Sequence, residues 1–195
     1  MPNVQPLDRP NLPQFEAMFA ALDDGFGFVP NSMLTMAHRP EILRGFSALG
    51  NAVLGPGTVD RALKQLIAFM ASNAAGCRYC QAHTSAQAAR AGAADEKLRE
   101  IFEFETSALY SEAERAALRL ARDAALVPNA TGPAHFAALR PHFSDAQVVE
   151  IVSVISLFGF LNRWNDTMAT TLEEEPLAFA AVTLAPAGWE AGKHA

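Results

Sequence analysis

Hydrophobic residues recur along most of this chain at the spacing of an amphipathic helix. The spacing i, i+3, i+4, i+7 puts apolar side chains on one helix face, whereas a β-strand alternates apolar and polar residues. We find no convincing alternation, so the sequence predicts an all-α protein. The clearest helical runs are Phe15, Met18, Phe19 and Leu22, and then Leu63, Leu66, Ile67 and Met70.

Glycine and proline mark the expected helix boundaries in the first half of the chain. Pro40 can open a helix to about Leu54, because proline fits the first helical position and residues 55–57 read Gly-Pro-Gly. Thr58 is a candidate cap for the next helix. Gly76 interrupts the helical pattern, and Gly92 is a plausible terminator for the helix in between.

Two capping boxes predict the helices of the second half. In this motif a serine caps the helix and a Glu or Gln three residues later caps it in return. The expected helices run through Leu126 and through about Met168, and residues 173–175 before Pro176 read as a solvated helix end. The two boxes are Ser111 with Glu114, and Ser144 with Gln147.

The predicted organisation is a single all-α domain with two extensions. Residues 1–14 contain four prolines and form an N-terminal arm that wraps a neighbour or lies loose, residues 15–175 form the domain, and residues 176–195 form a C-terminal tail. A shift of 85 residues aligns 52–92 with 137–175 and places Cys77-Arg78-Tyr79-Cys80 on Asn162-Arg163-Trp164-Asn165. This register predicts an internal duplication, in which a helix–Gly–helix frame occurs twice and the second copy has lost its thiols.

Charge and composition narrow the partners and the location. The net charge is −6 and the chain has no basic stripe, so we expect neither a nucleic-acid nor a membrane partner. The longest apolar run, 151–161, is shorter than the roughly 20 residues that span a bilayer. We expect a cytoplasmic protein, where a lone CxxC serves redox or metal chemistry more often than a structural disulfide.

The only two cysteines, Cys77 and Cys80, stand with His83 in the most informative segment of the chain. On a helix, residues three apart lie on one face with about 5–6 Å between Cβ atoms. That separation suits a reversible disulfide, and His83 can exchange a proton with a thiol. A zinc site is the alternative, but it needs a fourth ligand from elsewhere. A helix N-terminus would lower the thiol pKa of Cys77, whereas Cys80 depends more on His83.

The segment from Leu63 to His83 resembles the alkylhydroperoxidase D-like branch of the carboxymuconolactone decarboxylase superfamily, and 157–166 resembles its peroxidase-related members. The resemblance implies an all-α fold, obligate oligomers and thiol-dependent peroxide reduction. It makes Cys80 the peroxidatic thiol, Cys77 the resolving thiol and His83 the relay histidine. His83 comes one residue earlier than in the family motif, and Gln65 replaces the relay glutamate. Gln65 therefore orients a group or makes a helix–helix hydrogen bond, and Tyr79 packs or lines the pocket.

The sequence thus predicts a (hydro)peroxide reductase that uses no cofactor, with an external dithiol as reductant. The expected assembly is a homo-oligomer, a trimer or hexamer by resemblance, with a dimer also open. We interpret the polar group Asn162, Arg163, Asn165 and Asp166 as a helix-packing and subunit-contact network. Two other functions stay open: a carboxymuconolactone decarboxylase-like enzyme acting on a lactone, and a redox-sensing protein without turnover.

Overall fold

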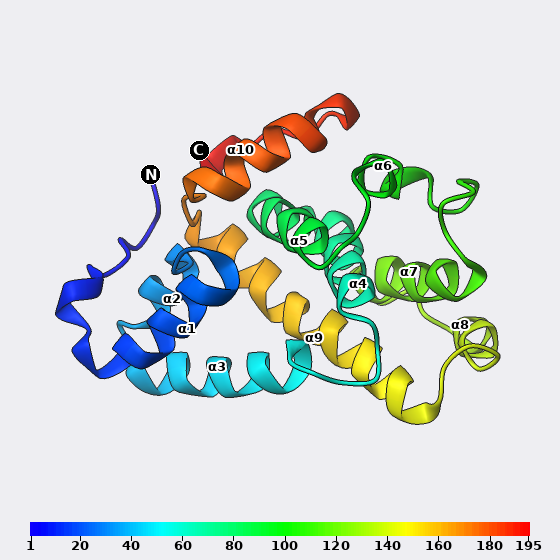
Figure 1. Ribbon diagram of the computed structural model, residues 1–195, viewed down its shortest axis with the longest axis horizontal. Coiled ribbons are helices and arrows are strands. Elements are labelled where there is room, and N and C mark those ends of the chain that lie inside the picture. Colours follow the sequence, from blue (N-terminus) through cyan, green and yellow to red (C-terminus); the bar gives the residue numbers. More distant parts are fainter.

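The computed structural model describes residues 1–195 and is built from helices alone, as the sequence predicts (Figure 1). Ten α-helices are joined by loops and by five short 3₁₀ segments. Their bounds are α1 Glu16–Phe26, α2 Asn31–Met36, α3 Pro40–Leu54, α4 Arg61–Ala74, α5 Arg78–Arg90, α6 Asp95–Arg99, α7 Glu112–Ala124, α8 Pro133–Leu139, α9 Asp145–Met168 and α10 Glu174–Thr183.

Most of the predicted boundaries are confirmed. Helix α3 has the predicted limits, and both capping boxes are formed at the starts of α7 and α9. Gly92 follows the last turn of α5 with a φ of +97°, a left-handed conformation that favours glycine. The predicted cap at Thr58 is wrong: Asp60 caps α4, because its carboxylate accepts the backbone N–H of Leu63.

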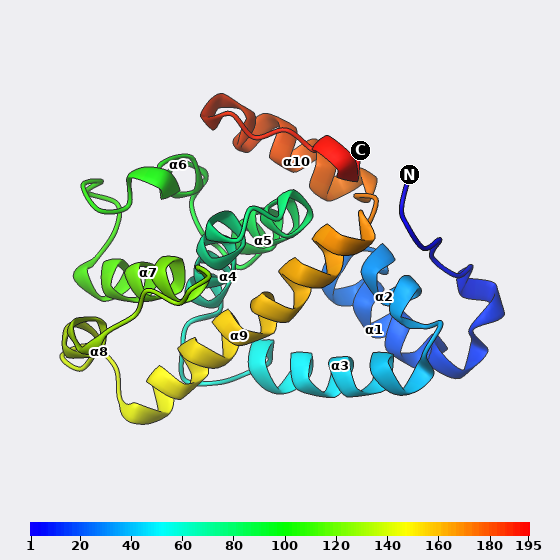
Figure 2. The same ribbon diagram turned by 180° about the vertical axis from the view of Figure 1, so that it is seen from behind.

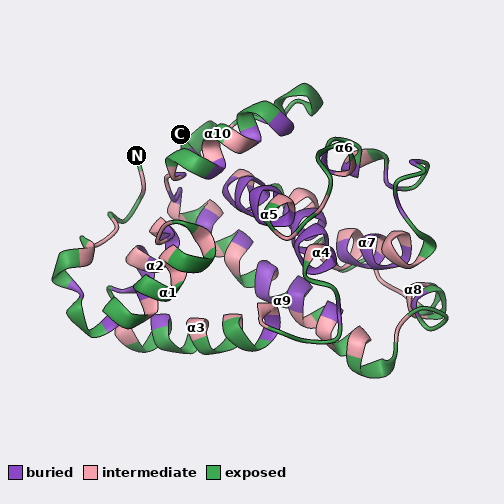
Figure 3. Ribbon diagram, viewed as in Figure 1, coloured by how far each residue is buried: buried purple, intermediate pink, exposed green.

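Helices α4 and α5 form an antiparallel hairpin at the centre of the molecule, and α9 crosses beside it (Figures 1 and 2). Helices α7 and α10 also pack on this hairpin, so α4 and α5 are buried on most faces (Figure 3). Among the ten helices, α9 is the one long and apolar enough to cross a membrane. It packs against α3, α4, α5 and α7, and 33% of its most apolar 18-residue stretch is buried in the protein.

The buried apolar side chains fall into two clusters. The larger cluster surrounds α4, α5, α7 and α9, and its fully buried members include Ile67, Phe69 and Leu118. The smaller cluster lies under the N-terminal arm and α1–α3, and includes Phe19 and Leu43. Two clusters in contact leave a seam between them, and the candidate site lies in that seam.

Both chain extensions pack on the body of the protein. The N-terminal arm neither lies loose nor extends away: Leu7 donates a backbone hydrogen bond to Leu34, and Leu12 is buried in the smaller cluster. Residues 176–195, which we expected as a tail, belong mostly to α10 and the turns after it. Trp189 and His194 are buried there, so this segment covers one side of α5.

The structure does not show the predicted duplication. The first copy has the helix–Gly–helix frame, with Gly76 in a left-handed conformation between α4 and α5. The second copy has one uninterrupted helix, α9, which runs through Gly159. The predicted break in the second copy is therefore wrong, and the duplication itself stays a prediction.

Candidate active site

The turn between α4 and α5 places both thiols at the start of α5. Gly76 has a φ of +76°, which reverses the chain after α4. Cys77 then occupies the N-cap position of α5, and Cys80 lies one turn further along the helix. Both cysteines are free and buried. Local sequence thus fixes the two sulfur atoms on one end of a well-packed helix.

A cavity of about 960 Å³ opens in the seam between the two apolar clusters. One stripe of α5 faces it, because Cys80, His83, Thr84 and Gln87 follow the spacing i, i+3, i+4, i+7. Cys77 does not line the cavity. Of the two cysteines, Cys80 is therefore accessible from the cavity and Cys77 is not. Apolar side chains make up much of the remaining wall, among them Met18, Leu22, Met33, Phe46, Phe158 and Leu161.

Glu173 completes the site and was missed by sequence reasoning. Its carboxylate lies 2.6 Å from Nε2 of His83 and accepts a 2.8 Å hydrogen bond from the Tyr79 hydroxyl. The backbone N–H of Asn31 also donates to it, over 2.5 Å. The interpretation of Glu173 as part of a solvated helix end is wrong, since only 11% of its side chain is exposed.

The pKa of Glu173 reflects these contacts. Burial alone would raise the pKa of this carboxyl, but the charge and hydrogen bond of His83 and the Asn31 amide outweigh burial and hold it below its ordinary value. The imidazole stacks on the Tyr79 ring at a centroid distance of 4.3 Å. Glu173 thus anchors His83 through Nε2 and leaves Nδ1 without a protein partner.

The predicted proton exchange between His83 and a thiol has no direct contact in the structure, because His83 hydrogen bonds to neither cysteine. Asn165 is the side chain that meets Cys80: its Nδ2 lies 3.4 Å from Cys80 Sγ. The predicted repeat aligned these two residues. Asn162 and Asn165 are buried within this chain, which makes the subunit-contact interpretation wrong for both.

The two thiols differ in acidity. A hydrogen bond from Cys80 lowers the pKa of Cys77, with help from backbone N–H groups at the helix start. Burial raises the pKa of Cys80 well above its ordinary value. Cys77 is therefore the more acidic of the two thiols, as its place at the helix N-terminus led us to expect, whereas Cys80 is the thiol that lines the cavity.

Gln65 lies on α4 and lines the cavity. The alternative interpretation of Gln65 as one half of a helix–helix hydrogen bond is wrong, because its carboxamide has no hydrogen-bond partner in the protein. Tyr79 also lines the cavity, and burial raises the pKa of its hydroxyl well above the ordinary value. Tyr79 therefore stays neutral, and its hydroxyl donates a hydrogen bond to Glu173.

A buried ion pair holds the loop 55–60, which forms part of the cavity wall. Lys64, only 2% exposed, lies 2.5 Å from Glu150 at the start of α9 and also donates to the carbonyls of Val53 and Gly55. Glu150 in turn accepts hydrogen bonds from Thr58. A Cβ at Gly57 would stand 1.9 Å from Glu150 Oε1, so any larger residue there would displace this carboxylate from Lys64.

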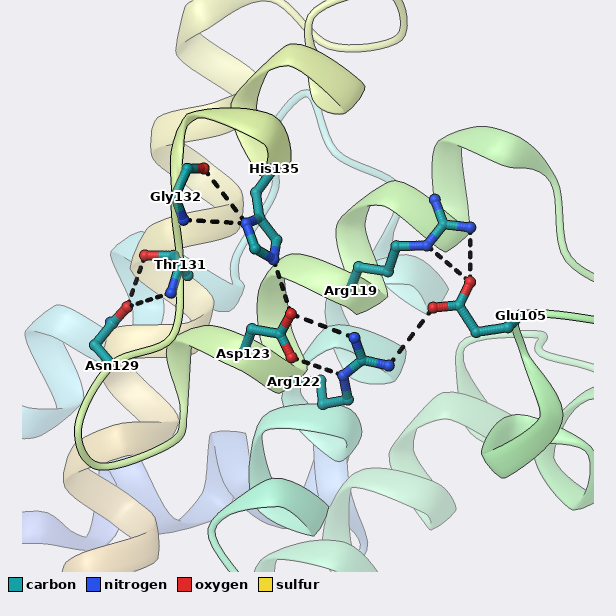
Figure 4. Close-up of polar contacts among 8 residues, drawn as sticks. All are labelled: Glu105, Arg119, Arg122, Asp123, Asn129, Thr131, Gly132 and His135. Carbon is teal, nitrogen blue, oxygen red and sulfur yellow. Dashed lines mark hydrogen bonds and ion pairs between the residues drawn. The ribbon is translucent and has the colours of Figure 1, made fainter.

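A second polar cluster lies away from the cavity, between α7 and α8 (Figure 4). Nε2 of His135 lies 2.8 Å from Asp123, and Nδ1 accepts the backbone N–H of Gly132 over 3.1 Å. Arg122 also pairs with Asp123. Both ring nitrogens of His135 are thus occupied, and the cluster fixes the α7–α8 connection. No three Cys, His, Asp or Glu side chains converge as metal ligands anywhere in the chain, so the zinc alternative finds no ligand set.

Comparison with known proteins agrees with the fold. Residues 40–123 match the model of the carboxymuconolactone decarboxylase family, and the chain belongs to this family. The apo structure of the debrominase Bmp8 is 38% identical, covers 91% of this chain and 96% of its own, and has a TM-score of 0.86. Another Bmp8 structure holds 2,3,4-tribromopyrrole.

Two further proteins are similar to this chain. A peroxidase-related protein from Ralstonia eutropha JMP134, described as an alkylhydroperoxidase AhpD core, is 25% identical over 93% of this chain and 97% of its own, with a TM-score of 0.81. The uncharacterized protein YdfG of Bacillus subtilis (strain 168) is 28% identical over 110 residues, which are 55% of this chain and 72% of that protein.

Proposed function

We propose that this protein is a thiol-dependent reductase of organic hydroperoxides, with Cys80 as the attacking thiol. The observation that carries the proposal is the arrangement of the thiols, with Cys80 open to a large cavity and Cys77 one turn behind it. Similarity to peroxidase-related proteins supports it. A cavity of about 960 Å³ with an apolar wall is far larger than hydrogen peroxide needs, which favours an organic substrate.

In the proposed first step Cys77, the more acidic of the two thiols, begins as the thiolate. The Cys80 proton moves to the Cys77 thiolate, and the Cys80 thiolate attacks the terminal oxygen of the hydroperoxide. The O–O bond breaks, Cys80 becomes a sulfenic acid, and the departing alkoxide takes a proton to form an alcohol. His83 is the proposed proton donor, through Nδ1, because Glu173 can balance an imidazolium through Nε2.

The second step closes the disulfide. The Cys77 thiol displaces the hydroxyl group of the Cys80 sulfenic acid, so a sulfur–sulfur bond forms and one water leaves. The protein has then lost two electrons, which an external dithiol returns. Asn165 is the proposed positioning residue for Cys80, since its amide points at the sulfur.

Similarity to the debrominase favours a second candidate, reductive removal of a halogen from an aromatic ring. The same thiols could serve: Cys80 takes the bromine as the carbon–bromine bond breaks, and the ring carbon takes a proton. Cys77 then attacks the Cys80 sulfur, which releases bromide and forms the same disulfide. Both reactions transfer an electrophilic atom to sulfur and oxidise the protein by two electrons.

One experiment separates these candidates. Reduced protein is treated with one equivalent of cumene hydroperoxide, hydrogen peroxide or 2,3,4-tribromopyrrole, and its disulfides and small-molecule products are identified by mass spectrometry. We expect a Cys77–Cys80 bridge with cumene hydroperoxide, and turnover when dithiothreitol is added. Bridge formation with the bromopyrrole alone would favour the debrominase candidate. Substrate consumption by a Cys77→Ala/Cys80→Ala variant would refute both candidates, because each requires the thiols.

A further inference from the structure

Two buried carboxamides on the cavity wall have no hydrogen-bond partner. Gln65 is 6% exposed and Gln87 is 5% exposed, and both line the cavity. Neither carboxamide bonds to the protein, and its atoms remain accessible from the cavity, so both are free to bind a group that enters it. Other buried polar side chains nearby have partners: Gln81 donates to the Ser72 carbonyl, and Thr84 to the Cys80 carbonyl.

Gln65 on α4 and Gln87 on α5 lie at a similar level along the axis of the helical hairpin. The hydrogen bond from Gln81 to Ser72 marks which residues of α4 and α5 lie side by side, while the packing of the two helices holds them there. Gln65 precedes Ser72 by seven residues and Gln87 follows Gln81 by six, so both lie toward the end of the hairpin away from its turn. Gln87 is seven residues beyond Cys80, about 10 Å along the helix at a rise of 1.5 Å per residue.

Charge on the cavity wall limits what these amides can bind. Besides the Cys80 thiol and the Tyr79 phenol, the titratable side chains that line it are His83, Asp60 and Arg61. His83 is committed to Glu173, while Asp60 and Arg61 are exposed neighbours of opposite sign. A charged ligand group beside the two amides would therefore be buried without a counter-charge, which is costly.

We infer that Gln65 and Gln87 bind an uncharged hydrogen-bonding group, such as a hydroxyl or a ring N–H, on an otherwise apolar substrate. The group lies at the end of the substrate remote from the atom that Cys80 attacks. A carboxamide both donates and accepts, so the pair fits a group that does the same. The orientation of the substrate in this inference rests on the proposed function, in which Cys80 attacks the opposite end. The two amides then select a class of substrate that the thiols alone would not.

The test measures binding without turnover, in a Cys80→Ser background. The probes are 6-bromo-2-naphthol and its methyl ether, in which a methyl group replaces the hydroxyl hydrogen at the end opposite the bromine. We expect the naphthol to bind at least tenfold more tightly by calorimetry, because the ether leaves a buried amide oxygen without a donor. In the Gln65→Leu/Gln87→Leu variant this preference should fall to less than twofold.

Protein stability supplies the second measurement. Replacing an unpaired buried amide with leucine should leave the melting temperature unchanged or raise it, whereas Gln81→Leu, the matched control, should lower it and keep the tenfold preference. Equal affinity for the two probes, binding of neither, or a preference that survives the double substitution would overturn the inference. Failure of the peroxide experiment alone would not affect this result, since the binding test involves no reaction.

Discussion

The buried ion pair between Lys64 and Glu150 gives the sharpest prediction about stability. Glu150→Gln removes the negative charge and keeps the shape of the side chain, so Lys64 stays buried beside a neutral group. Contacts with Lys64 and with Thr58 outweigh burial and lower the Glu150 pKa from 4.5 to about 2. At 1.36 kcal/mol per unit, this difference corresponds to at most about 3 kcal/mol of folding stability at neutral pH.

Two features of the site change the expected loss of stability in Glu150→Gln. Breaking a buried pair by removing one partner typically costs about 3–5 kcal/mol. Here Lys64 keeps two carbonyl acceptors, at 2.9 and 3.0 Å, and the Glu150 side chain is 16% exposed. We therefore expect Glu150→Gln to lose about 2–3 kcal/mol at pH 7. For a domain of this size, that loss lowers the melting temperature by about 5–10 °C.

Urea unfolding at several pH values would measure this loss. A depressed carboxyl pKa contributes stability that is fully present above the unfolded pKa and disappears as the pH falls through the folded pKa. The difference between wild type and Glu150→Gln should thus be constant down to about pH 5 and shrink between 4.5 and about 2. Glu175→Gln is the matched control, because its pair with Arg90 is exposed and should contribute less than about 1 kcal/mol. A Glu150→Gln loss below about 0.5 kcal/mol at pH 7, or one that does not change with pH, would refute this reasoning.

Three further predictions concern the site and the assembly. Cys77→Ser should still form a sulfenic acid that dimedone traps, and Cys80→Ser should not; the reverse result would assign the first attack to Cys77. Glu173→Gln should slow peroxide-driven disulfide formation at least tenfold and lower stability at pH 7, with a stability difference that shrinks below pH 4.5, the ordinary value from which this carboxyl is depressed. An unchanged rate would limit Glu173 to a structural role. Light scattering should show a homo-oligomer, since apolar side chains such as Val149 and Phe160 are 66% and 43% exposed on α9; a fully active monomer would contradict this.

The helices could be predicted from sequence because the signals that start and stop them are local. A capping box acts within four residues, and the left-handed conformation at Gly92 depends on the missing Cβ. The thiol pair and His83 were also predictable, since their spacing alone puts them on one helix. Glu173 was not, because it approaches His83 only after α10 folds across α5, 90 positions along the chain. Its neighbours Glu174 and Glu175 are exposed, so composition gave no sign that Glu173 was different.

Helix α9 connects the stability of the cavity wall with the environment of the thiol. Glu150 in its second turn holds the loop 55–60, and Asn165 near its other end contacts Cys80, about 22 Å away at 1.5 Å per residue. Loosening the loop by Glu150→Gln should therefore weaken substrate binding without changing the acidity of either thiol. The rate of thiol alkylation as a function of pH would then match wild type, even where the apparent affinity for a hydroperoxide has fallen. Such a separation would mean that the cavity wall and the redox pair respond to different parts of one helix.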